Sequence, residues 1–287
     1  MKFILSIFFT TILFAQNSGL SFLERSNSSR ANSLGNIKLF SPELLQLNSN
    51  PSIFCIANTT KFQYSNTVLP FDANQSVLSY NLNSKKYFYA LNFISHNLKN
   101  IEVRETPGEK IGDTKLTDYK IGTTFGYTFD TSLAIGVNLN LLHENLFIES
   151  ANGYSIDFGI YRKTSFADFA FAINNLGKMD RMNLQNIKLP LIFLGGIKKS
   201  YSFNGSENSV FLETHYYNNN HKLYTVIGNE VNYNNLFFRV GNIFGNESKS
   251  YTFGFGIKFL KFVFDYSFVP HKFSLGDEHS MTVSILK

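Results

Sequence analysis

Apolar and polar residues alternate along most of the chain from about residue 59 to the end. The pattern is clearest over residues 251–268, where aromatic residues fall on one side and glycine, polar or charged residues on the other. Successive side chains of a strand point to opposite faces, so such a stretch predicts strands with one aromatic and one small or polar face. Leu260-Lys261 divides this stretch and predicts a tight turn between two strands.

The same alternation recurs about fourteen times, which allows roughly 16 residues for each membrane strand with its connection. Residues 96–116 and 175–189 are predicted as long loops, and Asn152-Gly153 is typical of a hairpin turn. We predict strands near residues 61–64, 77–80, 87–93, 121–129, 133–141, 154–160, 169–173, 190–199, 208–216, 222–231, 235–244, 249–259, 261–268 and 279–286.

We interpret residues 59–287 as an all-β, transmembrane, antiparallel up-and-down barrel of about 14 strands. Such a barrel turns its aromatic face to lipid and its polar face to a lumen. A soluble two-sheet sandwich is the alternative, although so many strands with this segregation exceed an ordinary sandwich. Six charged residues lie opposite the aromatic ones and predict a hydrated or mutually paired lumen; they are Asp157, Asp168, Glu213, Arg239, Lys258 and Asp265.

The first 58 residues do not follow the strand pattern. Lys2 followed by the apolar run 4–14 predicts a signal peptide over residues 1–15, so the mature chain leaves the cytoplasm. Residues 16–58 are predicted to form a short N-terminal helical segment or plug. In it, Ser41-Pro42-Glu43 is typical of a helix start, with serine as the N-cap and proline at the first helical position.

Composition narrows the class of protein. The chain has 287 residues with Phe 31, Tyr 15 and Trp 0, only 16% charged residues, and a net charge of +5. Lysine and arginine do not cluster in the way that tracks phosphates, so we expect no nucleic-acid partner. The single cysteine, Cys55, is predicted to be a small buried hydrophobic residue.

The sequence offers little for catalysis. The six histidines show no metal-ligand spacing, and no nucleophile motif occurs. Glu213, His215 and His221 surround one predicted hairpin, and we interpret them as solvated turn residues. We therefore predict no catalytic, cofactor-binding or metal residues, and no cofactor.

Several short motifs, in this order, carry a resemblance to a known family. Near the N-terminus these are Phe22-Leu23, Ser29-Arg30-Ala31, Leu34-Gly35 and Asn50-Pro51; later come Asn175-Leu176-Gly177 and Leu189-Pro190. On these residues the chain resembles the PorV/PorQ family, FadL-like outer-membrane barrels of the type IX secretion system, with the spelling closer to PorQ. Asn36 and Ser52 depart from the family pattern, and the chain ends on Lys287 instead of an aromatic residue.

The resemblance implies a non-catalytic role in a Gram-negative outer membrane. PorV-like members bind the signal of exported cargo, and PorQ-like members anchor a surface partner. The implied partners are outer-membrane lipid and type IX secretion proteins, namely PorZ, PorU or PorV-like components. Two alternatives stay open: a FadL-like transporter of small hydrophobic molecules, and an outer-membrane enzyme with a nucleophile and base at the barrel rim.

Overall fold

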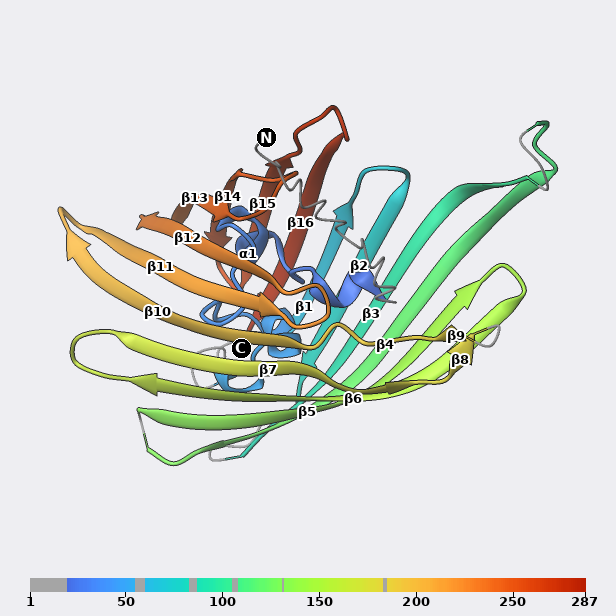
Figure 1. Cartoon of the computed structure of the whole chain (residues 1–287). Coiled ribbons are helices and arrows are strands. Elements are labelled where there is room, and N and C mark those ends of the chain that lie inside the picture. The colour runs from blue at the N-terminus through green and yellow to red at the C-terminus, as the bar shows by residue number, and fades with distance from the viewer. Residues whose placement is uncertain (1–19, 55–59, 83–86, 105–107, 131, 183–184) are drawn as a thin grey trace, which may run out of the picture.

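The computed structural model describes residues 20–54, 60–82, 87–104, 108–130, 132–182 and 185–287 (Figure 1). The predicted signal peptide and Cys55 lie outside the described residues. Fourteen strands build one sheet, and a two-stranded sheet of β8 (Arg181–Met182) and β9 (Gln185–Asn186) stands apart from it. The fourteen are β1 (Thr60–Val68), β2 (Ala73–Asn81), β3 (Tyr87–Val103), β4 (Gly112–Thr128), β5 (Leu133–Leu146), β6 (Glu149–Lys163), β7 (Asp168–Met179), β10 (Ile192–Phe203), β11 (Ser206–Tyr217), β12 (Lys222–Tyr233), β13 (Leu236–Phe244), β14 (Tyr251–Phe259), β15 (Phe262–Pro270) and β16 (Asp277–Leu286).

The sheet closes into a barrel because β1 pairs antiparallel with β16, from Thr60↔Leu286 to Val68↔His279. Every other strand pairs antiparallel with its neighbours in chain order, as an up-and-down barrel requires. The even strand number brings the start of β1 and the end of β16 to one end of the barrel, here called the termini end. The opposite end, the loop end, carries the long connections β3–β4 and β7–β10 (Figure 1).

The aromatic face of the strands points outward. Phe253, Phe255 and Phe264 are 48%, 54% and 45% exposed, whereas Thr252 and Asp265 on the opposite face are buried. A closed barrel leaves no unpaired backbone edge, and an outward-facing apolar band is stable in contact with the hydrocarbon of a lipid bilayer. The predicted fold class, a 14-strand antiparallel barrel with a short N-terminal helical segment, is confirmed.

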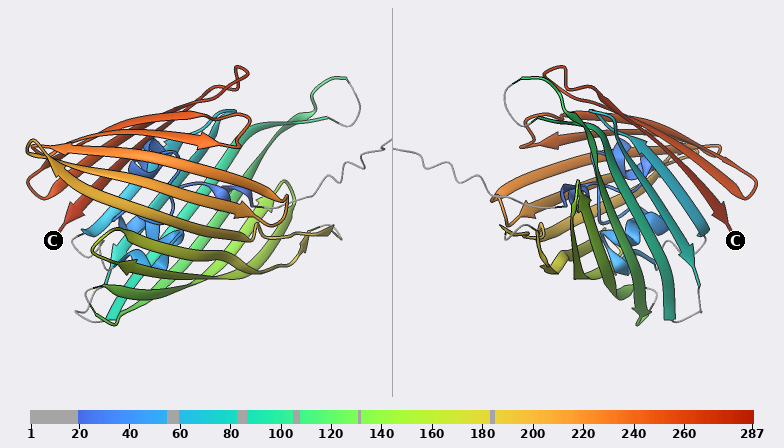
Figure 2. Two further views of the ribbon diagram at one scale, coloured as in Figure 1. Left: turned by 60° about the vertical axis from the view of Figure 1, so that its left-hand side comes forward. Right: turned by 90° about the vertical axis from the view of Figure 1, so that its right-hand side faces the viewer.

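The core of the molecule lies in the lumen, not between two sheets. Residues 20–54, here called the plug, run through the barrel as η1 (Ser21–Glu24), α1 (Ser29–Ser33), η2 (Leu44–Asn48) and η3 (Pro51–Ile53). Both views in Figure 2 show this segment, in blue, surrounded by the wall. Most of its apolar side chains are buried, and those of Leu34, Ile37, Leu39, Phe40 and Leu44 are fully so.

Among the described residues, no helix is both long enough and apolar enough to cross a membrane.

Three predictions about connections are wrong. Residues 175–189 are not one long loop, because β7 continues to Met179 and β8 and β9 follow it. Residues 96–116 are not one loop, because β3 continues to Val103 and β4 begins at Gly112. Polar pairs such as His96↔Asp118 keep the strands in register beyond their apolar part, since backbone hydrogen bonds do not depend on side-chain polarity. Asn152-Gly153 lies within β6, because β5 and β6 pair as far as Leu146↔Glu149 and the turn falls at residues 147–148.

The helix start predicted at Ser41 is also wrong. The helical turn that follows, η2, is a 3-10 helix whose N-cap position is Glu43, without a side-chain cap. Ser41 instead donates its hydroxyl hydrogen bond to the Glu43 carboxylate. The α-helix of the plug is Ser29–Ser33, which Ser28 caps by accepting from the Ala31 N–H at 3.2 Å.

Candidate functional site: the plugged lumen

Inward-facing glycines form the seat of the plug. A Cβ on Gly241 would lie 2.0 Å from the backbone nitrogen of Gly35, and a Cβ on Gly136 would lie 2.3 Å from the carbonyl carbon of Pro51. No side chain fits at such distances, so the plug backbone rests directly on the wall where glycine stands. Plug backbone would lie within 3 Å of a Cβ at Gly136, Gly228 and Gly241, and plug side chains would come as close at Gly126, Gly159, Gly196 and Gly254.

The first motif residues hold α1 against β13–β16. Ser29 donates twice to the wall: its N–H donates to Thr282 Oγ1 at 2.9 Å and its hydroxyl to Ser280 Oγ at 2.9 Å. Ala31 and Leu34 are fully buried beside them. Gly35, with φ +82°, turns the chain and donates its N–H to Thr252 Oγ1 at 2.8 Å.

The other plug motifs lie on the opposite side of the lumen, against β1–β6. The Phe22 ring stacks on His96 with centroids 5.8 Å apart, and Leu23 packs against the same apolar cluster. Asn50 caps η3 by accepting from the Ser52 N–H at 3.1 Å, and its amide donates to Leu39 O at 2.9 Å. Pro51 rests on wall glycine as described above.

The later motifs lie together at a bulge in the wall. The β6–β7 register shifts between Ile156 and Phe158, and Asn175 there has φ 64°. Its amide donates to Pro190 O at 2.8 Å, and Leu189 is buried in the apolar cluster nearby. Leu176 faces outward at 51% exposure, and Gly177 stands where a Cβ would lie 1.9 Å from Tyr154 O.

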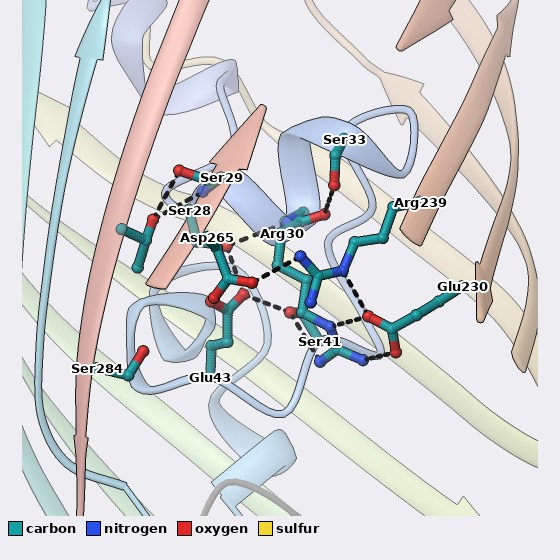
Figure 3. A network of polar contacts seen from close by, with 12 residues as sticks. Ser28, Ser29, Arg30, Ser33, Ser41, Glu43, Glu230, Arg239, Asp265 and Ser284 are labelled. Carbon is teal, nitrogen blue, oxygen red and sulfur yellow. Dashed lines mark hydrogen bonds and ion pairs between the residues drawn. The ribbon is translucent and has the colours of Figure 1, made fainter. Parts of the chain in front are cut away.

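A buried ion network ties the plug to the wall (Figure 3). The Arg30 guanidinium of α1 donates to both carboxylate oxygens of Glu230, from Nε at 2.6 Å and from Nη2 at 2.5 Å. Arg239 donates from Nε to Glu230 at 2.6 Å and from Nη1 to Asp265 at 2.6 Å. Since bidentate pairs fix geometry and an uncompensated buried charge costs about 3–5 kcal/mol, this network holds α1 in one position.

Glu43 extends the same network from the plug side (Figure 3). Its carboxylate accepts from the hydroxyls of Ser28 and Ser41, both at 2.5 Å, and from Gln63 Nε2 of β1 at 2.9 Å. Burial raises the pKa of Glu43, and the nearby charge of Asp265 raises it further. Three donors therefore stabilise a carboxyl group that has no directly paired cation in these contacts.

Glu213 of β11 holds the middle of the plug as it crosses the lumen. Its carboxylate accepts from the backbone N–H groups of Lys38 at 2.7 Å and Leu39 at 3.0 Å, and shares a hydrogen bond with His215 Nε2 at 2.9 Å. Glu213 and His215 are fully buried, so their interpretation as solvated turn residues is wrong; His221 does lie at the turn and is exposed. Strand β11 continues through them to Tyr217, which places both inside the lumen.

The other predicted lumen charges lie at different levels along the barrel axis. Asp157 is buried and accepts from Asn140 Nδ2 at 2.8 Å, from the Asn175 N–H at 2.7 Å and from Lys120 Nζ at 3.4 Å. Asp168, near the termini end, lies 3.8 Å from Lys198 Nζ.

Lys258, close to the end of β14, is exposed and takes no part in the buried network. The structure thus brings Arg239 and Asp265 together and leaves the other four apart.

Within the part of the chain that the structure describes, a cavity lies on each side of α1. A cavity of about 230 Å³ at the loop end is lined by plug residues 21–36 and strands β11–β16. One of about 250 Å³ at the termini end is lined by Arg30, Pro42, Glu43 and the wall below them. Arg30, Arg239 and Asp265 of the ion network line this second cavity and do not line the first.

Sequence reasoning missed Glu230, Lys38 and Glu278. Glu230 follows the same alternation as Arg239, but the polar Asn229 interrupts the outward row and weakens the signal. The Lys38 ammonium donates to Glu24 O at 2.6 Å, and burial lowers the pKa of Lys38 to about 8. Nothing in the local sequence marks Lys38, because the residues that bury it are distant in the chain. Among the described residues, no group of three or more histidine, cysteine or acidic side chains could hold a metal ion.

The closed wall and the internal plug define the class: this chain has the fold of a FadL-like outer-membrane barrel, the kind that resides in the Gram-negative outer membrane. It is similar to the toluene transporter TodX from Pseudomonas putida (11% identity, TM-score 0.64, covering 91% of this chain and 97% of that one). It is also similar to the CymD monoaromatic hydrocarbon channel (12%, 0.64, 94% and 98%) and to a Pseudomonas aeruginosa FadL homologue (8%, 0.52, 90% and 98%). No family model and no curated protein matches the sequence, and the PorV/PorQ family specifically gains no support.

Proposed function

We propose that this protein is an outer-membrane channel for small hydrophobic molecules, closed in this conformation by its plug. The observation that carries the proposal is a lumen filled by the chain's own N-terminal segment, with a cavity on each side of α1. The similar solved structures support it, since two of them are named as a toluene transporter and a hydrocarbon channel, and we propose no catalytic role. Long connections of such barrels face outside, so we orient the loop end outward.

The interior holds apolar side chains that such molecules would meet when the plug moves. Beneath the loop end, plug and wall residues form a buried cluster of aliphatic and aromatic side chains: Leu20, Phe22, Leu45, Val77, Ile94, Leu142 and Leu189. The plug meets the wall by hydrogen bonds, ion pairs and close packing. A passage between the two cavities therefore opens when α1 leaves its seat.

A disulfide between α1 and the wall tests this. The hydroxyls of Ser29 and Ser280 lie 2.9 Å apart, so Ser29→Cys with Ser280→Cys, in a Cys55→Ser background, suits a disulfide. We expect the oxidised variant to block uptake of toluene into proteoliposomes and reduction to restore it. The matched control, Ser65→Cys with Ser280→Cys, joins β1 to β16 across 3.4 Å and should transport equally in both states.

Two results would count against the proposal. Equal uptake by the oxidised and reduced plug variants would show that α1 need not move. No uptake above that of empty liposomes in any form would remove the channel itself.

A role in type IX secretion is the second proposal and rests on the sequence motifs. It is supported by Phe71 and Phe273, which are 71% and 77% exposed at the tips of neighbouring loop-end hairpins, where a surface partner would cover them. The N-terminal motif residues have structural roles in seating the plug, and the later ones lie at the β6–β7 bulge of the wall. Recovery of PorZ, PorU or PorV-like proteins with the tagged barrel from outer membranes would favour this second role, whereas the barrel recovered alone would not.

A further inference from the structure

The cavity at the loop end has a basic corner that a purely hydrocarbon ligand does not need. Three basic side chains converge on one oxygen of Glu278: Arg25 Nη2 at 2.7 Å, Lys249 Nζ at 2.5 Å and His271 Nε2 at 2.8 Å. Glu278 is buried, while the side chains of Arg25 and Lys249 keep 25% and 21% exposure. A guanidinium carries five N–H donors and an ammonium three, so both cations retain donors beyond the one that Glu278 receives.

The other carboxylate lining the cavity does not neutralise this corner. Glu24 lines the same cavity, but among the described residues the ion pairs of Arg25 and Lys249 are with Glu278 and not with Glu24. Arg25 and Lys249 therefore share one carboxylate, and the corner carries an excess of positive charge.

One side of the cavity wall is aromatic and aliphatic, while serine, asparagine, threonine and histidine side chains line most of the rest. Tyr217 and Tyr224 lie with ring centroids 5.2 Å apart, and Val226, Ile243 and Val269 complete the surface beside them. An apolar side that receives a ring, beside polar groups that fix its orientation, is a feature of small-molecule sites. With about 230 Å³, the cavity is smaller than the roughly 300–1,000 Å³ of drug-sized ligand sites, so it suits one ring more than a long chain.

We propose that this cavity binds a small aromatic acid, with its carboxylate between Arg25 and Lys249 and its ring against Tyr224 and Ile243. A cationic ligand would meet two like charges at the basic corner. A neutral hydrocarbon would desolvate the basic groups without replacing the lost hydrogen bonds. The inference deepens the proposed channel function, on which it rests for its biological meaning, by naming the class of molecule that enters from the loop end.

Equilibrium binding to the purified full-length barrel in detergent tests the site without transport. The probes are benzoate, benzyl alcohol and benzylamine, which share one ring and differ in charge. Because hydrogen bonds to charged groups contribute about 1.5–3 kcal/mol, we expect benzoate to bind roughly tenfold or more tightly than benzyl alcohol, and benzylamine weakest. Equal affinity of the wild-type protein for benzoate and benzyl alcohol would overturn the inference. This comparison needs no variant, so it holds even if the variants fail to fold.

Variants locate the effect in this cavity. Lys249→Met should weaken benzoate binding about tenfold and leave benzyl alcohol unchanged, while Lys249→Arg restores benzoate binding. Lys258→Met removes an exposed lysine near the other end of the barrel and is the matched control. Unaltered benzoate affinity in folded Lys249→Met would overturn the assignment.

Uptake measurements separate the two proposals. If toluene is taken up but benzoate binds no more tightly than benzyl alcohol, the acid site is refuted and the channel function is retained. If benzoate binds more tightly than benzyl alcohol but no uptake occurs, the channel function is refuted and the acid site is retained.

Discussion

A methyl group placed under α1 should open the lumen without breaking the wall. In Gly241→Ala, the new Cβ would lie 2.0 Å from Gly35 N, whereas ordinary contact begins at 3.4 Å, so the plug must retreat by about 3.4 − 2.0 = 1.4 Å. Thr252 Oγ1, at 2.5 Å, must also turn away, and it is the group that binds Gly35 N and Ser33 O. Overpacking of this kind costs about 1–3 kcal/mol.

That cost falls on the docked plug and raises the population of the released state by roughly 5- to 150-fold. We expect a matching rise in single-channel open probability in planar bilayers and faster proteolysis of residues 20–43. Gly195→Ala is the control, because a Cβ there meets nothing within 4 Å. Heat-modifiable mobility in electrophoresis checks that the Gly241→Ala barrel is folded. If the folded variant keeps the open probability and protease resistance of the wild type, the plug is not closely packed on Gly241.

Three further changes test other contacts. Arg30→Met should destabilise plug docking by about 3–5 kcal/mol in thermal unfolding, because Arg239 alone then faces the two buried carboxylates of Glu230 and Asp265. Arg104→Met breaks only an exposed pair and should change the melting temperature little. Burial lowers the pKa of Lys38 from 10.5 to about 8, so the released plug binds more protons between these values and docking should strengthen as pH rises from 8 to 10.5. Protease protection followed over pH checks this, and Lys38→Met should flatten the profile. Phe255→Arg on the lipid face should destabilise the barrel in bilayers by about 2–4 kcal/mol, and Leu260→Arg at a turn should be tolerated; equal stability of both would contradict the lipid-facing assignment.

The wall was predictable because its signal is local and repeated. Outward Phe253 and inward Thr252 follow from a period of two, whatever the rest of the chain does. The ends of the strands were less accessible, since pairs such as His96↔Asp118 continue the backbone ladder through polar residues that look like a loop. The contacts between the plug and the wall glycines could not be predicted for another reason. The glycines indicate a small inward face, but only the folded chain shows that the plug covers them.

The ion network was out of reach from the sequence. Arg30 and Glu230 are 200 residues apart, and the partner of an inward carboxylate depends on how the plug threads the lumen. Arg30 entered the sequence analysis through a family motif, which marked the residue without giving its contact. Glu43 was interpreted as the first turn of a helix, although its carboxylate is occupied by three donors from the plug and the wall.

The position of the two cavities implies that only part of the plug must move. Both border residues 21–43 and neither is lined by η2 or η3, so a continuous passage needs α1 to leave while η3 stays seated. Gly136→Ala tests this, because its Cβ would lie 2.3 Å from Pro51 and displace η3 by a distance similar to that of α1 in Gly241→Ala. We expect Gly136→Ala to destabilise docking comparably in thermal unfolding and to leave the open probability near that of Gly195→Ala. Equal open probability in Gly136→Ala and Gly241→Ala would contradict this and mean that the plug leaves the lumen as one body. The contact of η3 with Gly136 would then control opening as strongly as the contact beside α1.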